Sequence, residues 1–409
     1  MPSSLLFDPT DPEFIADPYP VFEALRARGE VHHHDGFGFP LAVSYQACST
    51  VLRGPQLQRV WQDVTPTDEF TSFNLLHRNS MLENEPPRHT RLRRLVAGAF
   101  NRGHTERLRP TVQAVADRLV ADVVERIRDG ADADLLAMLA APLPIEVIAD
   151  LLGIPASDRP LLQPWSNAIV KMYEYGRSLP QQFAAEQAAG EFIDYLRVLV
   201  DHRRRHPGDD LITDLVALVS GSDAGQGPPD DDAGHLTADE LVGTAALLLM
   251  AGHEATVNVL GNGVLALLRN RTQWRRLRND LSLTGTAVEE LIRYDSPLQM
   301  FERTAVADVE IGGMELSAGQ KVAALLGAAA RDPAMFKDPD LLDIGRRPNP
   351  HLGFGAGIHY CLGAPLARVE VHAALVALTR QLPRLRLAGE PTRRAEFAIR
   401  GLTALPVTG

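Results

Sequence analysis

The chain has 409 residues, of which 45% are hydrophobic and 23% are charged, and its formal net charge is −11. This balance is ordinary for a folded globular protein, and the negative charge argues against a general nucleic-acid binder, which needs a basic surface. The two cysteines, Cys48 and Cys361, cannot build a disulfide framework. No stretch offers the roughly 18 uninterrupted apolar residues of a membrane span, and the N-terminus has no basic segment before an apolar run. We therefore expect a cytoplasmic protein with no membrane or nucleic-acid partner.

Helix is the main element that the sequence predicts, because apolar residues recur at spacings of three and four in seven segments. The predicted helices span residues 87–100, 106–128, 144–152, 182–205, 237–268, 287–294 and 364–382. Thr237 and Glu240 form a predicted capping box at the start of the fifth helix. Residues 221–235, rich in glycine, proline and aspartate, read as a linker. Short strands are expected in residues 307–325, with a hairpin turn at Gly312 and Gly313.

The predicted helix over residues 237–268 is almost wholly apolar up to Met250, which indicates a central, buried helix. Its middle then reads "AGHEAT", residues 251–256. A pair of small residues followed by an acid is costly inside a buried helix unless something large or polar lies against it. Two interpretations stay open for this stretch taken alone. Either a bulky ligand lies against the helix, or the glycine allows a close helix crossing and Glu254 faces solvent.

Three further groups of polar residues carry weaker signals. Glu290 and Arg293 are three apart on a predicted helix and can form a charge-assisted pair, either structural or on a solvated face. His89 and Arg93 are four apart on one helix face, where they suit an anion or belong to a basic surface helix. The histidines at positions 32–34 point to alternate faces of a strand and lack supporting ligands, so we interpret them as structural or surface residues.

The segment "HLGFGAGIHYCLGAPLAR", residues 351–368, contains a pattern specific enough to suggest a family. Its residues Phe354, Gly355, Gly357, His359, Cys361 and Gly363 resemble the haem-binding signature of cytochromes P-450, F-G-x-G-x-H-x-C-x-G. The glycines let the backbone fold tightly under a flat macrocycle. Cys361 lies just before the helix predicted from Ala364, whose dipole favours a thiolate. The resemblance therefore implies that Cys361 is the proximal haem ligand and binds the iron.

The resemblance covers nearly the whole chain and implies its fold. We expect a mainly α protein with a small β region: a single cytochrome P-450 domain over residues 1–409, β-rich near the N-terminus and at residues 300–325. The haem is expected between the long central helix and the cysteine-ligand loop. Glu290 and Arg293 match the E-x-x-R pair of the family, and Arg346 stands where a meander arginine completes that structural network.

The resemblance also implies which residues bind the cofactor. Four donors, His89, Arg93, Arg303 and His359, match positions that bind the haem propionates. Ala251 and Gly252 match the groove of the central helix that makes room for dioxygen. The expected cofactor-binding set is His89, Arg93, Ala251, Gly252, Arg303, Phe354, His359, Cys361 and Gly363.

The expected catalytic residues Glu254, Ala255 and Thr256 depart from the family at one position. The family usually places threonine directly after the acid, whereas here Ala255 stands there and Thr256 follows about 100° further round the helix. Some soluble bacterial members share this replacement and look as though a substrate hydroxyl and ordered water complete the proton relay. Peroxide-using relatives tend to carry arginine and proline at these positions, so Glu254 favours the oxygen-dependent cycle.

The activity implied by the resemblance is that of a haem-thiolate monooxygenase, which inserts one oxygen atom from O2 into a small organic substrate or couples it oxidatively. The expected cofactors are haem b and O2, with electrons from NAD(P)H through a ferredoxin and a ferredoxin reductase. We expect a monomer with a docking surface formed by Arg91, Arg94 and Arg347. The alternative from another class is a haem-binding sensor or ligand carrier without turnover, which would not consume NADH.

The expected substrate pocket is assigned by resemblance to variable regions of the family. Its residues are Trp61, Phe73, Trp165, Leu247, Gln299, Met300, Phe301 and Leu402. Polar residues in the same regions include Asp68, Glu69 and Glu302. These favour a substrate with polar or cationic groups, such as a secondary metabolite of polyketide or peptide origin.

Overall fold

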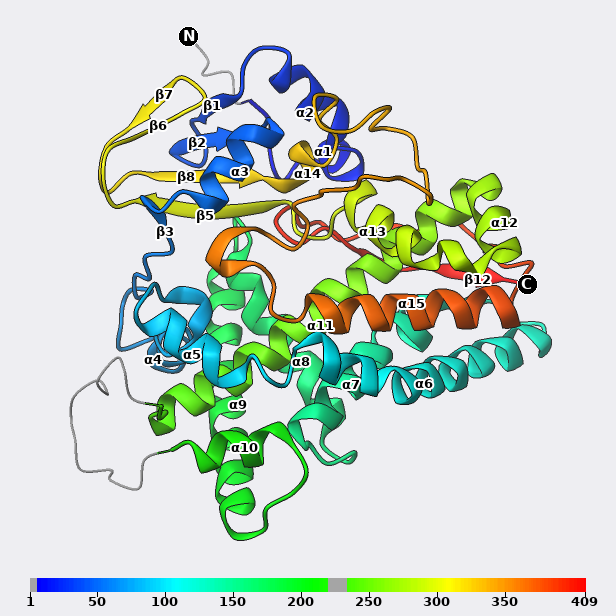
Figure 1. The fold of residues 1–409 in the computed structure, drawn as a ribbon, viewed down its shortest axis with the longest axis horizontal. Helices are drawn as coiled ribbons and strands as arrows, with labels where there is room; N and C mark the ends of the chain where they lie inside the picture. Colours follow the sequence, from blue (N-terminus) through cyan, green and yellow to red (C-terminus); the bar gives the residue numbers. More distant parts are fainter. Residues whose placement is uncertain (1–5, 220–233) are drawn as a thin grey trace. The chain divides into compact units, whose positions relative to one another are not determined.

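The computed structural model describes residues 6–219 and 234–409 (Figure 1). The chain divides into two compact units, each assembled from segments that are far apart in the sequence. Unit 1 contains residues 1–58, 109–143 and 255–409, and unit 2 contains residues 59–108 and 144–254. The predicted linker at residues 221–235 lies, except for its last two residues, outside the described part of the chain.

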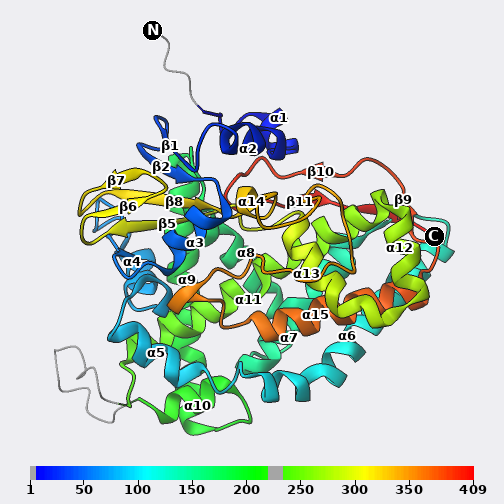
Figure 2. The ribbon, with the colours of Figure 1, turned by 45° about the horizontal axis from the view of Figure 1, so that its top comes forward.

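Unit 1 contains a five-stranded sheet in the order β1-β2-β8-β5-β3. Its strands are β1 (Val31–His34), β2 (Phe39–Ala42), β8 (Lys321–Leu325), β5 (Met300–Ala305) and β3 (Leu57–Gln58). β2 and β8 are parallel, and the other neighbours are antiparallel. Helix α3 (Tyr45–Arg53) packs on this sheet, as both views show (Figures 1 and 2). Cys48 of α3 is buried in this core and donates its thiol proton to the carbonyl of Ala42 (3.1 Å).

The predicted hairpin is confirmed as β6 (Val309–Ile311) and β7 (Met314–Leu316), which pair antiparallel. Gly312 and Gly313 turn the chain with φ of 55° and 81°, values that favour glycine. The remaining small sheets of unit 1 are β4-β12-β9 and β10-β11. Their strands are β4 (Ala133–Asp134), β9 (Arg386–Leu387), β10 (Thr392–Arg393), β11 (Leu402–Ala404) and β12 (Pro406–Thr408).

Unit 1 also contains the second half of α11 (Ala238–Arg269), which enters this unit at Ala255, and further helices. They are α1 (Pro12–Ala16), α2 (Tyr19–Arg26), α6 (Arg102–Arg128) from residue 109 on, η2 (Leu136–Ala140), α12 (Arg271–Asn279), η4 (Leu281–Leu283), α13 (Thr284–Tyr294), α14 (Leu326–Ala329), η5 (Gly357–His359) and α15 (Ala364–Gln381). α13 and α12 both contact α15. α6 is tied to α15 because the amide of Gln113 donates to the carbonyl of Ala373 (3.3 Å).

Unit 2 is helical and centres on α9 (Leu179–Arg205), against which α8, α4 and α10 pack (Figure 2). Its other elements are α4 (Thr71–Arg78), η1 (Met81–Glu83), α5 (Arg88–Val96), α7 (Pro142–Leu152) from residue 144 on, α8 (Arg159–Val170), η3 (Lys171–Tyr173), α10 (Leu211–Ala217) and the first half of α11. α9 begins with a capping box in which Ser178 and Gln181 satisfy each other's backbone N–H groups.

All seven predicted helices are present, with ends that differ from the predicted ones by a few residues. The capping box of α11 is confirmed, since Thr237 Oγ1 accepts from the N–H of Glu240 (3.0 Å) and Glu240 Oε2 accepts from that of Thr237 (3.1 Å). The sequence missed several other helices, namely α1, α2, α3, α4, α8, α10, α12 and α14. In α12, for example, only two apolar side chains are buried, Trp274 and Leu277. Within residues 6–219 and 234–409, no helix has the length and apolarity needed to span a bilayer.

Candidate functional site

Cys361 lies between a tightly folded glycine loop and the first turn of α15 in unit 1. Its N–H donates to the carbonyl of Phe354 (2.9 Å). Gly355 and Gly357 both have a φ of 68°, and a Cβ on Gly357 would lie 2.6 Å from the carbonyl oxygen of Leu52 in α3. The loop therefore places a half-buried cysteine that forms no disulfide at the N-terminus of an 18-residue helix. The partial positive charge of that helix end favours a thiolate, the form that binds iron.

Strand β5 lies beside this loop and supplies a buried cation. A Cβ on Gly355 would lie 3.7 Å from Cε2 of Phe301 in β5, which places the strand next to the loop. Two residues on, Arg303 is 4% exposed and donates from Nη1 to the carbonyl of Glu302 (2.7 Å). His359 is half-buried in η5, within the loop itself. Unit 1 thus combines a thiol with two nitrogen donors, a set that fits a haem and its carboxylates.

Helix α11 is buried over most of its length but accessible on one side near its middle. Between Leu241 and Leu268, a fully described stretch, only Ala251, Gly252 and Ala255 are not buried. They occur at i, i+1 and i+4 and so share one side of the helix. Their side chains are at most a methyl group, so this accessible side of α11 leaves room for a flat ligand, which is the second observation that fits a haem.

The residues next to this accessible side support one part of the simpler interpretation of "AGHEAT" and contradict the other. A Cβ on Gly252 would lie 2.9 Å from Cγ1 of Ile148 in α7, so this glycine does allow a close helix crossing. Glu254, however, is only 5% exposed, and its carboxylate does not face solvent as the simpler interpretation requires. His253 is also buried, with Nδ1 3.0 Å from the carbonyl oxygen of Leu249.

Helix α5 carries the unit 2 residues expected to bind propionates. His89 is 3% exposed, and Arg93 lies one turn later and is half-buried. The helix is anchored by Arg91, which donates to Glu240 of α11 with Nη2–Oε1 and Nη1–Oε2 distances of 2.6 and 3.1 Å. Burial alone would raise the pKa of Glu240, but its hydrogen bonds and charged partners lower it overall. The anchor fixes the face on which His89 and Arg93 lie.

The same ion pair corrects one sequence-based expectation. Arg91 is 2% exposed, so it cannot belong to a docking surface. Its guanidinium is committed to Glu240 and to the carbonyl of His235 (2.7 Å). Arg94 and Arg347 are exposed, as the docking hypothesis requires. The sequence could not separate Arg91 from Arg94, because α5 carries arginines on both its buried and its exposed sides.

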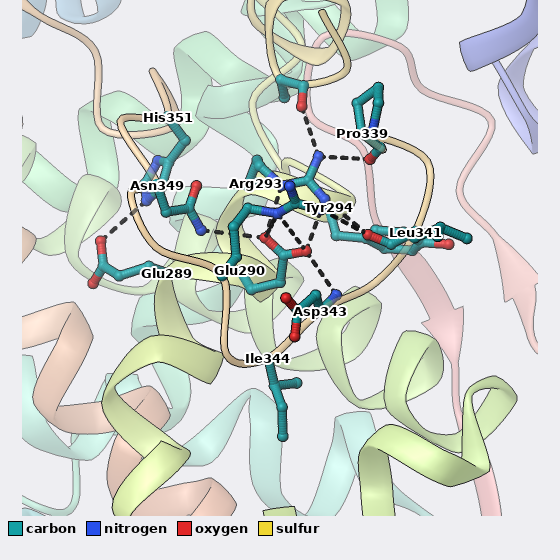
Figure 3. A network of polar contacts seen from close by, with 12 residues as sticks. Glu289, Glu290, Arg293, Tyr294, Pro339, Leu341, Asp343, Ile344, Asn349 and His351 are labelled. Atoms are coloured by element: carbon teal, nitrogen blue, oxygen red, sulfur yellow. Dashed lines mark hydrogen bonds and ion pairs between the residues drawn. The ribbon is translucent and has the colours of Figure 1, made fainter. Parts of the chain in front are cut away.

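The three predicted network residues lie together around the buried carboxylate of Glu290. Figure 3 shows Glu290 with Arg293. Arg293 binds Glu290 with both ends of its fork, with Nε–Oε2 and Nη2–Oε1 distances of 2.7 and 2.8 Å. Arg346 Nε, Asn349 Nδ2 and the N–H of Asp343 also donate to it, at 3.0, 3.2 and 2.9 Å. Glu290 and Arg293 are both 0% exposed. The network therefore ties α13 to the loop of residues 339–349.

The predicted pocket residues are divided between the two units, and several have polar tips that are already bonded. In unit 2, Trp165 donates from Nε1 to Glu191 (2.9 Å), and Trp61 donates to Asp63 (2.7 Å). In unit 1, Gln299 is 0% exposed and donates from Nε2 to the carbonyl of Ser296 (2.6 Å). Phe73, Leu247, Met300 and Leu402 are buried, and Phe301 is half-buried. Trp61, Trp165 and Gln299 are thus held in fixed orientations by their neighbours.

The histidines at positions 32–34 behave as the sequence suggests. His34 is fully buried, with Nε2 2.9 Å from the carbonyl oxygen of Phe7, whereas His33 is exposed. In the described ranges, no cluster of three or more His, Cys, Asp or Glu residues could hold a metal ion.

Sequence reasoning missed Glu370, a buried acid in α15. Its carboxylate is 1% exposed and is hydrogen-bonded to the side chain of Thr256. Burial raises the pKa of Glu370 to about 8. Its Oε1 has no hydrogen-bond partner among residues 6–219 and 234–409. The signal was present in the sequence, since Glu370 is a lone acid in the apolar run "VEVHAALVAL".

Comparison with known proteins gives one consistent result. A family model described as cytochrome P450 matches residues 63–386. The cytochrome P450 monooxygenase PikC of Streptomyces venezuelae is 40% identical over 402 residues, which cover 97% of this chain and 92% of PikC. The polyketide biosynthesis cytochrome P450 PksS of Bacillus subtilis (strain 168) is 36% identical and covers 99% of this chain and 98% of its own length. The crystal structure of P450BioI in complex with an acyl carrier protein ligated to hexadec-9Z-enoic acid superposes with a TM-score of 0.89 at 34% identity, over 97% and 99% of the two chains.

Proposed function

Because the chain belongs to the cytochrome P450 family and is a haem monooxygenase that uses O2, we propose that Cys361 binds the haem and that the substrate is a secondary metabolite of polyketide or peptide origin. The observation that carries the first part is the position of Cys361 on its glycine loop at the N-terminus of α15. PikC and PksS, one of them named for polyketide biosynthesis, support the substrate class. A haem sensor without turnover has no support among these relatives.

A haem held by Cys361 through its thiolate would supply the oxygen chemistry. The role of the protein's own residues would be to hold this haem. We assign the propionates to His89, Arg93, Arg303 and His359, and the thiolate to Cys361. The cofactor is proposed to be haem b, since only Cys361 is expected to bind the iron and no second cysteine is close to it in the sequence.

Proton delivery is proposed to use Glu254, Thr256 and Glu370. Ala255 cannot donate or accept a proton, so the hydroxyl nearest to it in sequence is that of Thr256. Thr256 is bonded to Glu370, whose raised pKa of about 8 keeps its carboxyl group protonated at neutral pH. Glu370 can therefore hold a proton that Thr256 Oγ1 passes on. A hydroxyl or N–H of the substrate, or ordered water, completes the path that Ala255 leaves open.

This proposal is tested by measuring product formed per NADH. Substrate analogues that lack one hydroxyl or N–H should still bind and shift the spin state, yet divert reducing equivalents to peroxide. Glu254→Ala and Glu370→Gln should lower turnover for every substrate, whereas Ala255→Thr should restore coupling for the deficient analogue. Equal product per NADH for native and deficient substrates in both the parent and Ala255→Thr enzymes would disprove substrate assistance.

Electrons are proposed to reach the enzyme from NAD(P)H through a ferredoxin reductase and a ferredoxin. Arg94 and Arg347 offer exposed positive charge on an acidic protein. Ile358 and Tyr360, which lie just before Cys361 in the sequence, are 48% and 39% exposed and offer apolar contact area. Charge reversal at Arg94 should slow reduction by a ferredoxin and weaken its dependence on salt.

The substrate class is tested most directly by binding. Secondary metabolites from neighbouring biosynthetic genes would be screened for a ligand-induced shift of the Soret band. A polyketide or peptide metabolite should give a saturable shift, and a fatty acid or steroid of similar size serves as the control. A screen in which only the control ligands bind would overturn the proposed class.

A further inference from the structure

Glu289 precedes Glu290 in the sequence but belongs to a separate cluster (Figure 3). It accepts two hydrogen bonds from the fork of Arg368 in α15, with Nε–Oε1 and Nη2–Oε2 distances of 2.6 and 3.0 Å. It also accepts one from Nε2 of His351 (3.1 Å). Burial alone would raise the pKa of Glu289, but hydrogen bonds from His351 and Arg368 lower it to about 2. Glu289 thus joins α13 to both ends of the segment that carries Cys361.

His351 fixes the start of the cysteine loop against α13. Its Nε2 donates to Glu289, and its Nδ1 accepts from the N–H of Gly353 (3.2 Å), so a single neutral tautomer satisfies both contacts. A Cβ on Gly353 would lie 2.6 Å from Cγ2 of Ile292 in α13. The loop therefore packs directly against α13 at Gly353.

Arg368 fixes the other end of the loop. Its guanidinium carbon lies 4.4 Å from the centre of the Phe354 ring, a cation–π distance, and its Nη1 and Nη2 lie 3.3 and 3.4 Å from the Tyr360 hydroxyl. Phe354 is the residue whose carbonyl accepts the N–H of Cys361, and Tyr360 is the residue before Cys361. A single guanidinium therefore contacts two residues that determine where the cysteine backbone lies.

We propose that Glu289, Arg368 and His351 act together as positioning residues that hold the Cys361 loop in the geometry needed for thiolate ligation. The inference rests on the proposed role of Cys361 and adds to it. Glu289 orients the planar fork of Arg368, and the fork in turn holds Phe354 and Tyr360. The positioning role of Arg368 depends on the planar shape of its guanidinium as well as on its charge.

The test measures the haem ligand rather than turnover. The reduced carbon monoxide complexes of the parent, Glu289→Gln, Arg368→Met and Arg368→Lys proteins would be followed in mild urea, and the rate at which the thiolate-type band converts to the thiol-type band recorded. Glu289→Gln and Arg368→Met should convert at least about tenfold faster than the parent, since each loses a charge-assisted contact. Arg368→Lys should stay within about twofold of Arg368→Met, because lysine keeps the charge but lacks the fork.

A matched control is Arg276→Met, which removes another arginine–carboxylate pair of unit 1, that with Asp343 (2.8 Å). It should convert at the rate of the parent. Parent-like conversion in Glu289→Gln and Arg368→Met, or full rescue by Arg368→Lys, would overturn the positioning role while leaving Cys361 as the ligand. A parent protein without any thiolate-type band would instead overturn the proposed function itself.

Discussion

Helix α13 carries two buried carboxylates, Glu290 and Asp295, that build networks of different kinds. Glu290 takes its main partner, Arg293, from the same helix turn. Asp295, at the C-cap of the helix, binds Arg400 (2.7 Å), Arg393 (2.8 Å) and the hydroxyl of Tyr19 (2.8 Å), which lie far from it in the chain. The first network therefore organises one loop, and the second joins the N-terminal and C-terminal segments of unit 1.

The two networks also differ in what remains when the carboxylate is lost. Glu290 and Arg293 are both 0% exposed, so a stranded Arg293 cannot reach water. Arg393 is 17% exposed and so can reach water. Carbonyl acceptors do not distinguish the networks, since Arg293 also donates to the carbonyls of Ala330 and Pro339 (2.8 Å each), as Arg400 does to those of Ile15 and Ala16. The cost of breaking a buried ion pair therefore depends on whether the cation left behind can reach water. The following predictions rank that cost.

The largest effect is expected for Glu290→Ala. It leaves Arg293 without its carboxylate in a site closed to water, and the cost should be about 3–5 kcal/mol of unfolding free energy. The measurement is the yield of soluble, haem-loaded protein together with urea unfolding. Glu390→Ala, which breaks an exposed pair with Arg269, is the control and should change little. Soluble, haem-loaded Glu290→Ala protein of parent stability would contradict the account.

Asp295→Asn should cost less, about 2–3 kcal/mol, because hydrogen bonds to a charged group are lost while Arg393 can reach water. Urea unfolding of the haem-loaded protein measures it. A loss equal to or greater than that of Glu290→Ala would show that the two networks do not differ as described.

Lowering the pH should reduce the free energy of unfolding of unit 1, because it protonates carboxylates whose pKa values are lowered in the folded protein. Burial opposes the shift of Asp295, but Arg400 and Arg393 lower its pKa, and the pKa of Glu289 falls to about 2. Groups with a lowered folded-state pKa stabilise the protein above their unfolded pKa, and this contribution is lost as the pH falls through the folded one. The free energy of unfolding should thus drop by about 2 kcal/mol between pH 4.5 and 2, allowing for solvent screening at Glu289. Asp295→Asn should show a shallower slope, and an unchanged slope would refute the assignment.

Tyr19→Phe is expected to have the smallest effect, about 1 kcal/mol, because it removes one hydrogen bond to Asp295 and leaves both arginines in place. Thermal unfolding would resolve the difference from Asp295→Asn. A cost as large as that of Asp295→Asn would mean that the hydroxyl, and not the arginines, holds the network.

The same contrast explains what the sequence could predict. The spacing of Glu290 and Arg293, the capping box of α11 and the glycines before Cys361 are local patterns, and the structure contains each of them. The partners of Asp295 and Glu370 come from distant segments, so no spacing rule could pair them. The sequence also could not show which side chains are exposed, as the burial of Arg91 illustrates. Residues that act through contacts distant in the chain require the fold.

The central claim, that Cys361 binds the haem iron as a thiolate, is tested most directly by the spectrum of the reduced carbon monoxide complex. The parent should show the red-shifted band typical of cytochromes P450. Cys361→His should abolish that band while haem is still bound, because imidazole replaces the thiolate. An unchanged band in Cys361→His would contradict the assignment of the ligand and, with it, the account of the loop, of α15 and of the residues that position them.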